Sequence, residues 1–461
     1  MSWREECGVF GVWGDTEASR LTYLGLYAQQ HRGQESCGIV SLDQEQHIIH
    51  KGLGLVGEVF QSSDLERLTG AAAIGHVRYS TTGENQLTNA QPLTAQLMNG
   101  PIAFAHNGNI VNSNILRSKL IKDGAIFQGT NDSEILLHLL AKNEKSDLIP
   151  CLMECLPHLV GAYSIVLLWK EGMVALRDPH GFRPLVLGRR TREGGKAVVV
   201  ASETCAFDLI GAEYVREIQP GEIFWVDKDG EHSARFADEL AKKAQCVFEH
   251  VYFSRPDSVV FSQSVYEARK EMGKMLAREH AVPADIVIPV PDSGVPAALG
   301  YSMESGIPFE LGIIRNHYVG RTFIQPQQSI RDFGVRIKHN PQMAVLKGKR
   351  VVVVDDSVVR GTTSKKLIGL VRQAGATEVH LRIASPPTTG PCYYGVDTPR
   401  RKQLIASHQS VEEIRQFVGA DSLGYLAVEG LMKAVKGSTD KYCAACFDGK
   451  YPTDLYDLRK D

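Results

Sequence analysis

Hydrophobic and polar positions follow two different patterns along this chain. In the first part, up to about residue 229, short hydrophobic runs are separated by clusters of glycine, asparagine and proline, which is typical of strands joined by turns. The pattern predicts strands at residues 7–12, 38–42, 73–78, 102–105, 163–169, 198–201 and 222–226, and helices at residues 21–29, 133–142 and 148–159. Because strands and helices come in runs, we expect a layered α+β arrangement.

After about residue 241 the pattern changes to strands and helices that alternate. It predicts helices at residues 265–280, 295–305 and 363–374, and strands at residues 285–290, 309–314, 350–355 and 379–385. Alternation of this kind, with fully apolar strands, indicates a parallel sheet covered by helices on both faces. Ser410 and Glu413 have the spacing of a capping box, which predicts one more helix.

Composition narrows the class of protein. The 461 residues suggest about two to four domains, and a hydrophobic content of 43% is sufficient for packed cores. A net charge of −2 argues against a nucleic-acid partner, and no apolar run reaches the roughly 18 residues of a membrane span. The acidic start at Glu5 and Glu6 is unlike a secretory signal, and nine cysteines in so long a chain are unlike a disulfide framework. We therefore expect a protein of the reducing cytoplasm.

Cys7 is the most informative residue because only six residues precede it. If Met1 to Glu6 are removed, Cys7 carries both a thiol nucleophile and a free α-amine, whose pKa of about 8 suits proton transfer. Such a residue can attack a carbonyl group without a separate histidine or aspartate. The alternative is a small buried hydrophobic residue at the start of a strand, and Cys7 alone does not exclude it.

Four further segments accompany Cys7 in the first part. They are His31-Arg-Gly-Gln-Glu-Ser-Cys-Gly38, His76-Val-Arg-Tyr-Ser-Thr-Thr-Gly83, Ala105-His-Asn-Gly-Asn109 and Thr130-Asn-Asp-Ser-Glu134. The set resembles the class II, or N-terminal nucleophile, glutamine amidotransferases. The resemblance implies a four-layer αββα domain in which Cys7 attacks the glutamine side-chain amide, releases ammonia and leaves a glutamyl thioester for hydrolysis. Residues 177–184 and 201–204 also match this family and are interpreted as scaffold and substrate-side loops.

The same resemblance implies roles for four more residues. Arg78 would hold the glutamine α-carboxylate in a bidentate contact, and Asp132 would pair with the ammonium group. Asn107 and Gly108 would form the oxyanion hole through a side-chain amide and a backbone N–H. Each has a structural alternative: a surface ion pair for Arg78, a hairpin turn for the Asn-Gly pair, and a helix cap for Asp132.

A strand in the second part ends in two carboxylates. Four valines at residues 351–354 precede Asp355 and Asp356, and Gly361 precedes the expected helix. Open parallel sheets bind ligands at the carboxyl ends of strands, helix N-termini suit phosphate, and carboxylates suit ribose hydroxyls or Mg²⁺. A buried strand with a polar turn is the alternative. The segment resembles the motif with which type I phosphoribosyltransferases bind phosphoribosyl pyrophosphate (PRPP).

This second resemblance implies a PRPP site with one Mg²⁺ ion. The residues it implies in PRPP binding are Asp292, Ser293, Gly294, Asp355, Asp356, Ser357, Arg360, Gly361, Thr362 and Thr363, with Ser293, Asp355 and Asp356 near Mg²⁺. Residues 289–294 would bind pyrophosphate through backbone N–H groups, with a simple proline-rich turn as the alternative. The polar stretch 315–338 is interpreted as a lid over PRPP, with a solvated loop as the alternative.

Four cysteines form a separate group. Cys443 and Cys446 are a Cys-x-x-Cys pair, and Cys246 and Cys392 lie far from it in the sequence. The pair alone is compatible with a redox, zinc or iron–sulfur role, and four thiolates suit zinc as well as a [4Fe–4S] cluster. The short segment before Glu-Glu-Cys-Gly-Val-Phe-Gly resembles the propeptide of the iron–sulfur amidophosphoribosyltransferases. That resemblance implies one structural [4Fe–4S] cluster on these four cysteines.

The resemblance to the amidophosphoribosyltransferases covers nearly the whole chain. It implies the reaction glutamine + PRPP + water → 5-phosphoribosylamine + glutamate + pyrophosphate, the first committed step of purine synthesis, with internal passage of ammonia between the two sites. It also implies a homotetramer inhibited by purine nucleotides. We expect a propeptide at 1–6, a glutamine amidotransferase domain at 7–235, and a phosphoribosyltransferase domain with the cysteine tail at 236–461. Another glutamine-dependent transferase and a non-enzymatic PRPP-sensing regulator are the alternatives.

Overall fold

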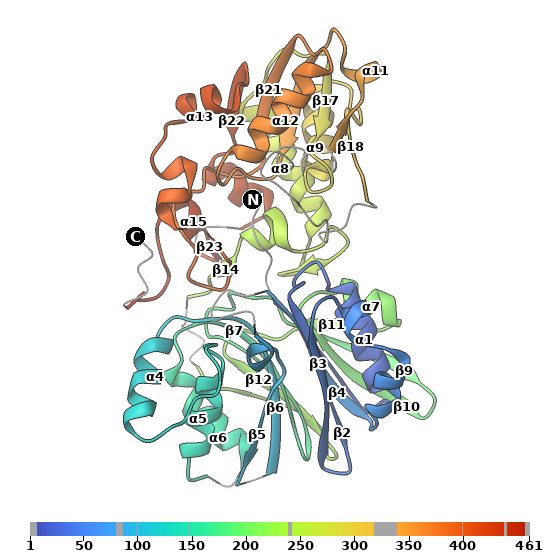
Figure 1. Cartoon of the computed structure of the whole chain (residues 1–461), viewed down its shortest axis with the longest axis vertical. Coiled ribbons are helices and arrows are strands. Elements are labelled where there is room, and N and C mark those ends of the chain that lie inside the picture. The colour runs from blue at the N-terminus through green and yellow to red at the C-terminus, as the bar shows by residue number, and fades with distance from the viewer. Residues whose placement is uncertain are drawn as a thin grey trace.

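The chain forms two parts that follow each other along the long axis of the molecule (Figure 1). This computed structural model describes residues 7–79, 86–98, 100–145, 147–237, 242–317, 339–398, 400–437 and 440–456. The expected propeptide, residues 80–83 of one quoted segment, and all but residues 315–317 of the expected lid lie outside the described residues.

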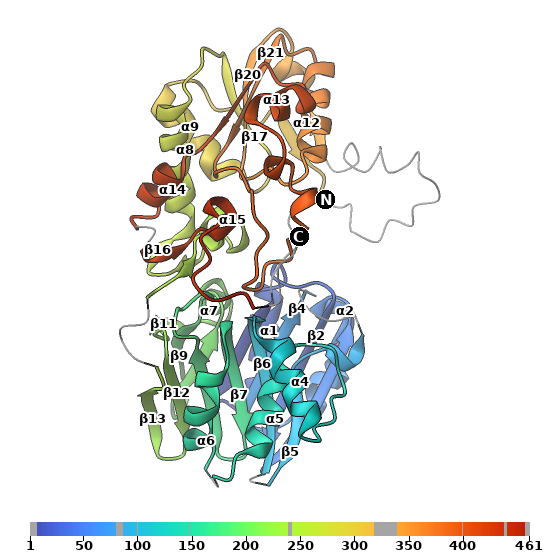
Figure 2. The same cartoon turned by 90° about the vertical axis from the view of Figure 1, so that its left-hand side faces the viewer.

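Two antiparallel sheets pack face to face in the first part (Figures 1 and 2). The first sheet has the order β11 (Glu213–Glu217), β9 (Val186–Arg192), β10 (Gly195–Ala201), β1 (Gly8–Trp13), β4 (Ala72–Arg78), β2 (Ser36–Asp43) and β3 (Gln46–Leu53). The second has the order β13 (Gly230–Arg235), β12 (Glu222–Asp227), β8 (Gly172–Arg177), β7 (Gly161–Trp169), β6 (Gly100–Ile110) and β5 (Leu93–Leu97).

Helices cover the outer face of each sheet. The first sheet carries α1 (Ala18–Ala28), α2 (Val56–Val59), α3 (Ser62–Arg67) and α7 (Cys205–Ile210), and the second carries α4 (Ser113–Lys122), α5 (Glu134–Lys142) and α6 (Leu148–Cys155). In β1, Val9 faces the opposite sheet whereas Phe10 and Val12 face the helices. Both faces of the strand are therefore buried, which explains its continuous hydrophobic run. The layers are helix, sheet, sheet and helix, as the expected αββα fold requires.

A parallel sheet organises the second part. It has the order β17 (Ile286–Pro289), β20 (Arg350–Asp355), β21 (Glu378–Ile383) and β22 (Ser422–Tyr425). One face packs on α8 (Val265–Glu279), α9 (Val295–Ser305) and α14 (Val428–Ala434), and the other on α12 (Thr362–Gln373) and α13 (Val411–Val418). Helices lie on both faces of the sheet, so the expected α/β domain with a parallel sheet is confirmed.

Shorter elements complete the described chain. They are 3₁₀ turns η1 (Leu87–Asn89), η2 (Leu156–His158), η5 (Arg401–Gln403) and η6 (Ile405–Ser407), the π-helical turn η3 (Glu249–Phe253), helices α11 (Met343–Leu346) and α15 (Ala445–Asp448), and the strand pairs β14 (Gln245–Cys246) with β23 (Tyr442–Cys443), β15 (Val259–Val260) with β16 (Gln263–Ser264), and β18 (Ile313–Arg315) with β19 (His339–Pro341). Among the described residues no helix is both long and apolar enough to cross a bilayer.

Several element predictions are confirmed to the residue. The helix expected at 295–305 is α9, and the strand expected at 350–355 is β20. The capping box also forms: the Glu413 N–H donates to Ser410 Oγ at 3.3 Å, and the Ser410 N–H donates to Glu413 Oε2 at 2.7 Å. At the start of α13 (Val411–Val418) a local sequence signal is sufficient, because the side chains of Ser410 and Glu413 satisfy the terminal N–H groups.

Two element predictions were wrong in part. Residues 309–314 were expected to form a strand, but Phe309 makes only an isolated bridge to Val287, and β18 pairs antiparallel with β19 outside the main sheet. Pro308 lacks an N–H and cannot extend the ladder backward from Phe309. The helix expected at 148–159 ends at Cys155 and continues as the η2 turn, because Pro157 cannot donate an α-helical hydrogen bond.

A buried histidine in η3 predicts a pH dependence of stability. The His250 ring lies beside Phe261 and Tyr442, with centroid separations of 5.8 and 6.0 Å, and neither of its ring nitrogens has a hydrogen-bond partner in the described structure. Burial, aided by the Arg269 charge, lowers the pKa of His250 to about 4. Unfolding lets this ring take up a proton near pH 6.5, so its contribution to stability is complete above about pH 6.5 and is lost toward about pH 4.

We expect His250→Phe to make the unfolding midpoint less sensitive to acid. The lost pH dependence corresponds to about 2 kcal/mol between about pH 6.5 and pH 5, since one pKa unit is about 1.4 kcal/mol. The measurement is the thermal unfolding midpoint of wild type and variant at both pH values. The exposed His408→Gln serves as control and should leave the pH dependence unchanged. Equal acid sensitivity of His250→Phe and wild type would contradict the expectation.

Candidate functional site

Cys7 lies immediately before β1, where the antiparallel register places it beside the end of β4. Its side chain is buried, and its Sγ–H donates to the carbonyl oxygen of Tyr79 at 3.5 Å. The guanidinium Nε of Arg32 donates to the carbonyl oxygen of Cys7 at 3.0 Å. Arg78 ends β4 next to this position and is only 3% exposed, so the alternative of a surface ion pair for Arg78 is wrong.

Asn107 and Gly108 lie inside β6, opposite Ser164 and Tyr163 of β7. The hairpin-turn alternative for this pair is therefore wrong. Gly108 has a φ of +150°, and a Cβ there would stand 2.0 Å from the carbonyl oxygen of Ala162, so only glycine is accommodated. The pair is held in the β6–β7 ladder, beyond the stretch of β6 that pairs with β5.

Ser202 connects Asn107 to the start of β1. Its Oγ accepts a hydrogen bond from the Val9 N–H at 3.0 Å and another from Asn107 Nδ2 at 3.5 Å. The Asn107 amide and the residue two positions after Cys7 thus share one buried hydroxyl. In the sequence analysis Ser202 belonged to the segment 201–204, which was interpreted as a scaffold or substrate-side loop. Its position directly after β10 was the sequence signal for a role near the site.

Asp132 turns back onto β6. Its Oδ2 accepts from the Ile110 N–H at 2.6 Å, and its Oδ1 accepts from Ser133 Oγ at 3.3 Å. The first turn of α5 is instead served by Asn131, whose Oδ1 accepts from the Glu134 N–H at 3.0 Å. The helix-cap alternative for Asp132 is therefore wrong, and its carboxylate lies two residues along β6 from Gly108.

Two buried histidines, His76 and His106, form hydrogen bonds next to the backbone of Asn107. His76 Nε2 bonds the carbonyl oxygen of His106 at 3.0 Å, and His106 Nδ1 bonds Ser133 Oγ at 2.8 Å. Burial lowers the pKa of His76 to about 3, so this ring is neutral near neutral pH, and its Nε2–H donates to the His106 carbonyl. Both histidines stood in the quoted segments, but their supporting contacts are long-range and had no sequence signal.

A buried ion network joins the two parts of the molecule at Cys7. Arg32 contacts Glu203 of the first part and, at 2.8 Å, Glu249 of η3. Arg183 contacts the same Glu249 at 3.2 Å. All four charged side chains are fully buried, so removing one would leave its partner uncompensated. Arg32 thereby ties the carbonyl of Cys7 to an element of the second part.

Asp355 and Asp356 lie at the carboxyl end of β20, and both are buried. Burial and the neighbouring charge of Asp356 raise the pKa of Asp355 well above its usual range. Burial also raises the pKa of Asp356, against the opposing effects of hydrogen bonds from Ser293 and Ser357 and of the Arg269 charge. Asp355 and Asp356 cannot easily ionise together, because they are buried and adjacent. Such a pair is suited to bind a cation or sugar hydroxyls.

The other expected PRPP residues lie at the same edge of the sheet. The 289–294 loop follows β17 and approaches β20 closely: a Cβ on Gly294 would stand 2.5 Å from the carbonyl oxygen of Val354. Asp292 pairs with Arg315 at 2.5 Å. Gly361, with a φ of +71°, precedes α12, whose first turn contains Thr362 and Thr363. Loop and helix start thus flank the two carboxylates, as the parallel topology requires.

Arg360 is turned toward another segment. Its Nη2 donates to Gln403 Oε1 at 2.9 Å, in the η5 turn. Ser357 Oγ instead donates to Asp356 Oδ1. Of the two, Ser357 therefore lies in direct contact with the carboxylate pair.

The four distal cysteines line one small cavity. Cys246, Cys392, Cys443 and Cys446 share it with aromatic residues that include Phe182, Tyr394 and Tyr451. The parallel pairing of β14 with β23 places Cys246 opposite Cys443. Burial raises the pKa of Cys443 to about 12, and burial with the charges of the other three thiols raises that of Cys446 further. No set of three or more His, Cys, Asp or Glu in the described chain has an arrangement that could hold a metal ion.

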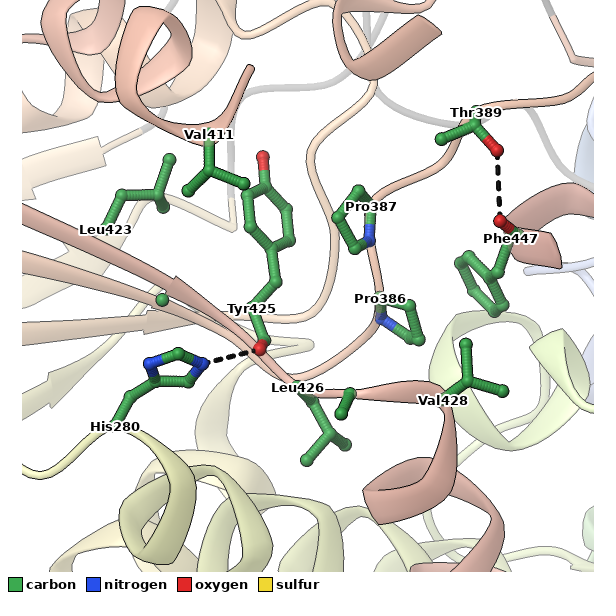
Figure 3. A pocket seen from close by; sticks show the side chains of 12 residues that line it. His280, Pro386, Pro387, Thr389, Val411, Leu423, Tyr425, Leu426, Val428 and Phe447 are labelled. Atoms are coloured by element: carbon green, nitrogen blue, oxygen red, sulfur yellow. Dashed lines mark hydrogen bonds between the residues drawn. The ribbon is translucent and has the colours of Figure 1, made fainter.

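A second cavity lies at the carboxyl end of β22 (Figure 3). Its volume is about 330 Å³, and Pro386, Pro387, Tyr425 and Phe447 are among its lining residues. His280 lies at its margin and bonds the carbonyl oxygen of Tyr425 at 2.9 Å. Among the described residues that line this cavity there is no carboxylate, lysine or arginine, so they offer no charged side chain to glutamine or PRPP.

Comparisons with known proteins agree over the whole chain. The glutamine amidotransferase domain family matches residues 76–208. The chloroplastic amidophosphoribosyltransferase of Glycine max is 54% identical over 457 residues, covering 99% of this chain and 80% of that protein. The amidophosphoribosyltransferase of Bacillus subtilis is 50% identical over 457 residues, covering 98% of this chain and 95% of that protein.

Two solved structures match with the same completeness. One is described as the allosteric regulatory enzyme of purine biosynthesis, with a TM-score of 0.93, 49% identity, and coverage of 98% of this chain and 97% of that chain. The other is the glutamine PRPP amidotransferase of B. subtilis in complex with ADP and GMP, with a TM-score of 0.92, 49% identity, and coverage of 98% and 99%. With such identity over nearly the full length of both partners, this chain belongs to the amidophosphoribosyltransferase family.

Proposed function

We propose that this amidophosphoribosyltransferase, a pentosyltransferase with glutamine amidotransferase activity, splits glutamine at Cys7 and uses the ammonia at a PRPP site around Asp355 and Asp356. The overall reaction is glutamine + PRPP + water → 5-phosphoribosylamine + glutamate + pyrophosphate, the first committed step of purine biosynthesis. The observation that carries the residue assignment is the shared hydroxyl of Ser202, which joins Asn107 to the β1 strand that begins beside Cys7. It connects the Asn107 side-chain amide to β1 at a point two residues after Cys7.

The glutamine chemistry proceeds in two steps. With residues 1–6 removed, the α-amine of Cys7 takes the thiol proton, the sulfur attacks the side-chain carbonyl, and the amine returns the proton to the departing ammonia. Asn107 Nδ2 and the Gly108 N–H stabilise the developing oxyanion, each by about 3 kcal/mol. Water then hydrolyses the glutamyl thioester to glutamate and restores the thiol.

Two charged residues select glutamine in this proposal. Arg78 binds the α-carboxylate, and its burial at the end of β4 strengthens that contact by excluding water. Asp132 binds the α-ammonium group, and its contacts with Ile110 and Ser133 keep the carboxylate oriented. A bidentate guanidinium and a carboxylate that bind the two charged groups on the glutamine Cα distinguish an amino acid from a simple amide.

PRPP is held by the edge of the parallel sheet in the second part. Asp355 and Asp356 bind the ribose hydroxyls, while Asp292, Ser293 and Gly294 bind the pyrophosphate. Gly361, Thr362 and Thr363 bind the 5′-phosphate at the start of α12, and Ser357 and Arg360 belong to the same PRPP-binding segment. Mg²⁺, which Ser293, Asp355 and Asp356 would hold, supplies positive charge for the departing pyrophosphate. The raised pKa values of the two carboxyl groups support a cation there, because bound positive charge favours their ionised form.

Internal passage of ammonia connects the two reactions. Ammonia that escaped to water at neutral pH would be protonated and lose its nucleophilic lone pair, so we propose that it moves within the protein. The buried contacts of Arg32 with Glu249 support a fixed spacing of the two sites. The regulator and sugar-phosphate alternatives are not supported, since the full-length relatives are amidophosphoribosyltransferases.

We also propose that the four distal cysteines hold one [4Fe–4S] cluster. The four thiols line one cavity, and both zinc and a [4Fe–4S] cluster accept four thiolates. We propose the cluster because the segment around Cys7 resembles that of the iron–sulfur amidophosphoribosyltransferases. Aromatic walls and raised thiol pKa values support a dry site in which cluster formation displaces the thiol protons.

Replacement of one cluster ligand should remove the metal. In Cys443→Ser we expect iron to fall from about four atoms per chain to near zero, together with acid-labile sulfide and the brown colour. The measurement is iron, zinc and sulfide analysis of anaerobically purified protein. Cys151→Ser, which changes a buried cysteine of α6, should keep the wild-type iron content. Stoichiometric zinc without sulfide in the wild-type protein would exclude the cluster.

We propose the limits 1–6, 7–235 and 236–461 for propeptide and domains, since β13 ends at Arg235 and completes the second sheet of the first part.

We propose a homotetramer, to be checked by mass in solution. We also propose inhibition by purine nucleotides, supported by the ADP and GMP complex of the B. subtilis relative. A cytoplasmic location agrees with nine free cysteines, although the Glycine max relative is chloroplastic.

A further inference from the structure

A loop of the second part packs against the strand that carries Asn107 and Gly108. The loop spans residues 392–398, and its shape is fixed by its own hydrogen bonds: the Cys392 N–H donates to Thr398 Oγ1 at 2.7 Å, and the Thr398 N–H donates to the carbonyl oxygen of Val396 at 2.9 Å. We call it the clamp loop. It reaches a strand of the other part that is almost 300 positions earlier in the sequence.

Gly395 of the clamp loop touches Gly108 directly. A Cβ at Gly395 would stand 3.0, 3.1 and 3.2 Å from the carbonyl carbon, Cα and carbonyl oxygen of Gly108. On its other side Gly108 abuts the carbonyl of Ala162, to which its own Cβ would come within 2.0 Å. The Gly108 peptide is thus enclosed between two backbones, and neither can yield easily because backbone atoms are less mobile than side-chain ends.

Further contacts attach the clamp loop on both sides of Gly395. Asn109 Nδ2 donates to the carbonyl oxygen of Tyr393 at 3.0 Å. Arg183 donates through Nε and Nη2 to the carbonyl oxygen of Tyr394, at 2.9 and 2.7 Å. The Tyr394 ring stacks on Phe182 with a centroid distance of 4.1 Å and an interplanar angle of 15°. Three consecutive residues of the loop, Tyr393 to Gly395, therefore contact the first part.

We propose that the clamp loop positions the oxyanion hole, with Gly395 and the carbonyl of Tyr393 as its positioning groups. They contact the Cα and carbonyl group of Gly108 and the side chain of Asn109, so the N–H donor on the same Gly108 Cα is correctly aimed only when the second part is docked. The inference rests on the proposed glutaminase role of Gly108. It assigns to residues of the phosphoribosyl part a contribution to glutamine hydrolysis that is independent of PRPP binding.

Gly395→Ala tests this placement. We expect the added methyl group to displace Gly108 and to lower kcat for glutamine hydrolysis at least about tenfold, since loss of a whole oxyanion donor costs about 100-fold to 1,000-fold. KM for glutamine and the rate of synthesis with ammonia should stay within about twofold of wild type. Alkylation of Cys7 by iodoacetamide, read as the mass of its peptide, should also keep its rate, because that reaction needs no oxyanion hole.

Backbone strain requires a matched control, because Gly395 has a φ of +103°. Gly230 has a φ of +125° with nothing within 4 Å of its virtual Cβ, so Gly230→Ala carries comparable strain without a clash and should hydrolyse glutamine at the wild-type rate. If Gly395→Ala does not fold, Asn109→Asp replaces the donor to Tyr393 by a repelling oxygen of equal size and should show the same selective loss of kcat.

Three results would overturn the inference. They are wild-type glutamine hydrolysis in Gly395→Ala or Asn109→Asp, a parallel loss of the ammonia-dependent rate, and an equal loss in Gly230→Ala. Wild-type hydrolysis in these variants together with an inactive Cys7→Ala protein would remove the role of the clamp loop but leave the proposed glutamine chemistry intact. Full activity of Cys7→Ala would instead remove the proposed function itself.

Discussion

Cys7→Ala is expected to lose glutamine-dependent synthesis by at least about a thousandfold while keeping ammonia-dependent synthesis within about twofold. The thiol is the only group in the proposed reaction that forms a bond to the substrate carbonyl, and removal of a nucleophile costs more than removal of any single supporting contact. Ammonia supplied from solution enters after this step, so the second part should still convert PRPP. The measurement is pyrophosphate release with glutamine and, separately, with an ammonium salt at alkaline pH.

Cys7→Ser is the matched variant for the same experiment. It keeps the size of the side chain and the α-amine, but its hydroxyl is a much weaker nucleophile than a thiol, so its glutamine rate should lie between wild type and Cys7→Ala. Both changes are small, since Cys7→Ser exchanges sulfur for oxygen and Cys7→Ala removes a single non-hydrogen atom. Loss of both activities in Cys7→Ala would show a structural role for the thiol.

The N-terminus of the active protein is a direct check on the proton acceptor. The proposed chemistry requires a free amine on Cys7, so intact mass and N-terminal sequencing of active protein should show a chain that begins at Cys7. Fully active protein that retains residues 1–6 would leave the thiol without the proposed base.

Asp356→Asn is expected to lower synthesis from both glutamine and ammonia by at least about 100-fold. The substitution keeps the size of the side chain, and Ser357 can still donate to the remaining oxygen. It removes the charge that the proposed site needs for Mg²⁺ and for the ribose hydroxyls, and both nitrogen sources depend on that site. The measurements are the two synthesis rates and the Mg²⁺ concentration that gives half-maximal rate.

Asp285→Asn is the control for this change. Asp285 precedes β17 at the opposite end of the same sheet, where it pairs with Arg350 at 2.9 Å, and it is partly exposed. Removing its charge should leave both rates within about twofold of wild type, since exposed ion pairs contribute little. PRPP turnover by Asp356→Asn at the wild-type rate would contradict the PRPP assignment.

Much of the fold followed from local patterns. The alternation of strands and helices after residue 241 predicted the parallel sheet, and the hydrophobic runs predicted β1, β4, β7 and β20 close to their observed positions. Sequence patterns did not predict strands whose pairing depends on residues far away in the sequence. The strand expected at 309–314 had suitable residues, but it had no long neighbour to pair with, and only Phe309 met β17.

The sequence likewise predicted only part of the candidate site. Motif spacing identified Cys7, Asn107, Gly108 and Asp132 as a set, because their order along the chain matches a known family. It could not show that Asn107 lies within β6 or that Asp132 turns away from its helix, since the same residue types are common in turns and caps. Burial and hydrogen bonds, which only the folded chain has, removed those alternatives.

By itself, the sequence determined the chemistry that is available: a thiol near the chain start, two carboxylates at a strand end, and four cysteines far apart. These are properties of residue types and short spacings, and no folding is needed to read them. Only the tertiary structure decided what each group meets. Ser202 between Val9 and Asn107, Gly395 against Gly108, and the cavity shared by the four cysteines join residues separated by up to hundreds of positions, and such contacts arise from sheet packing that no local pattern encodes.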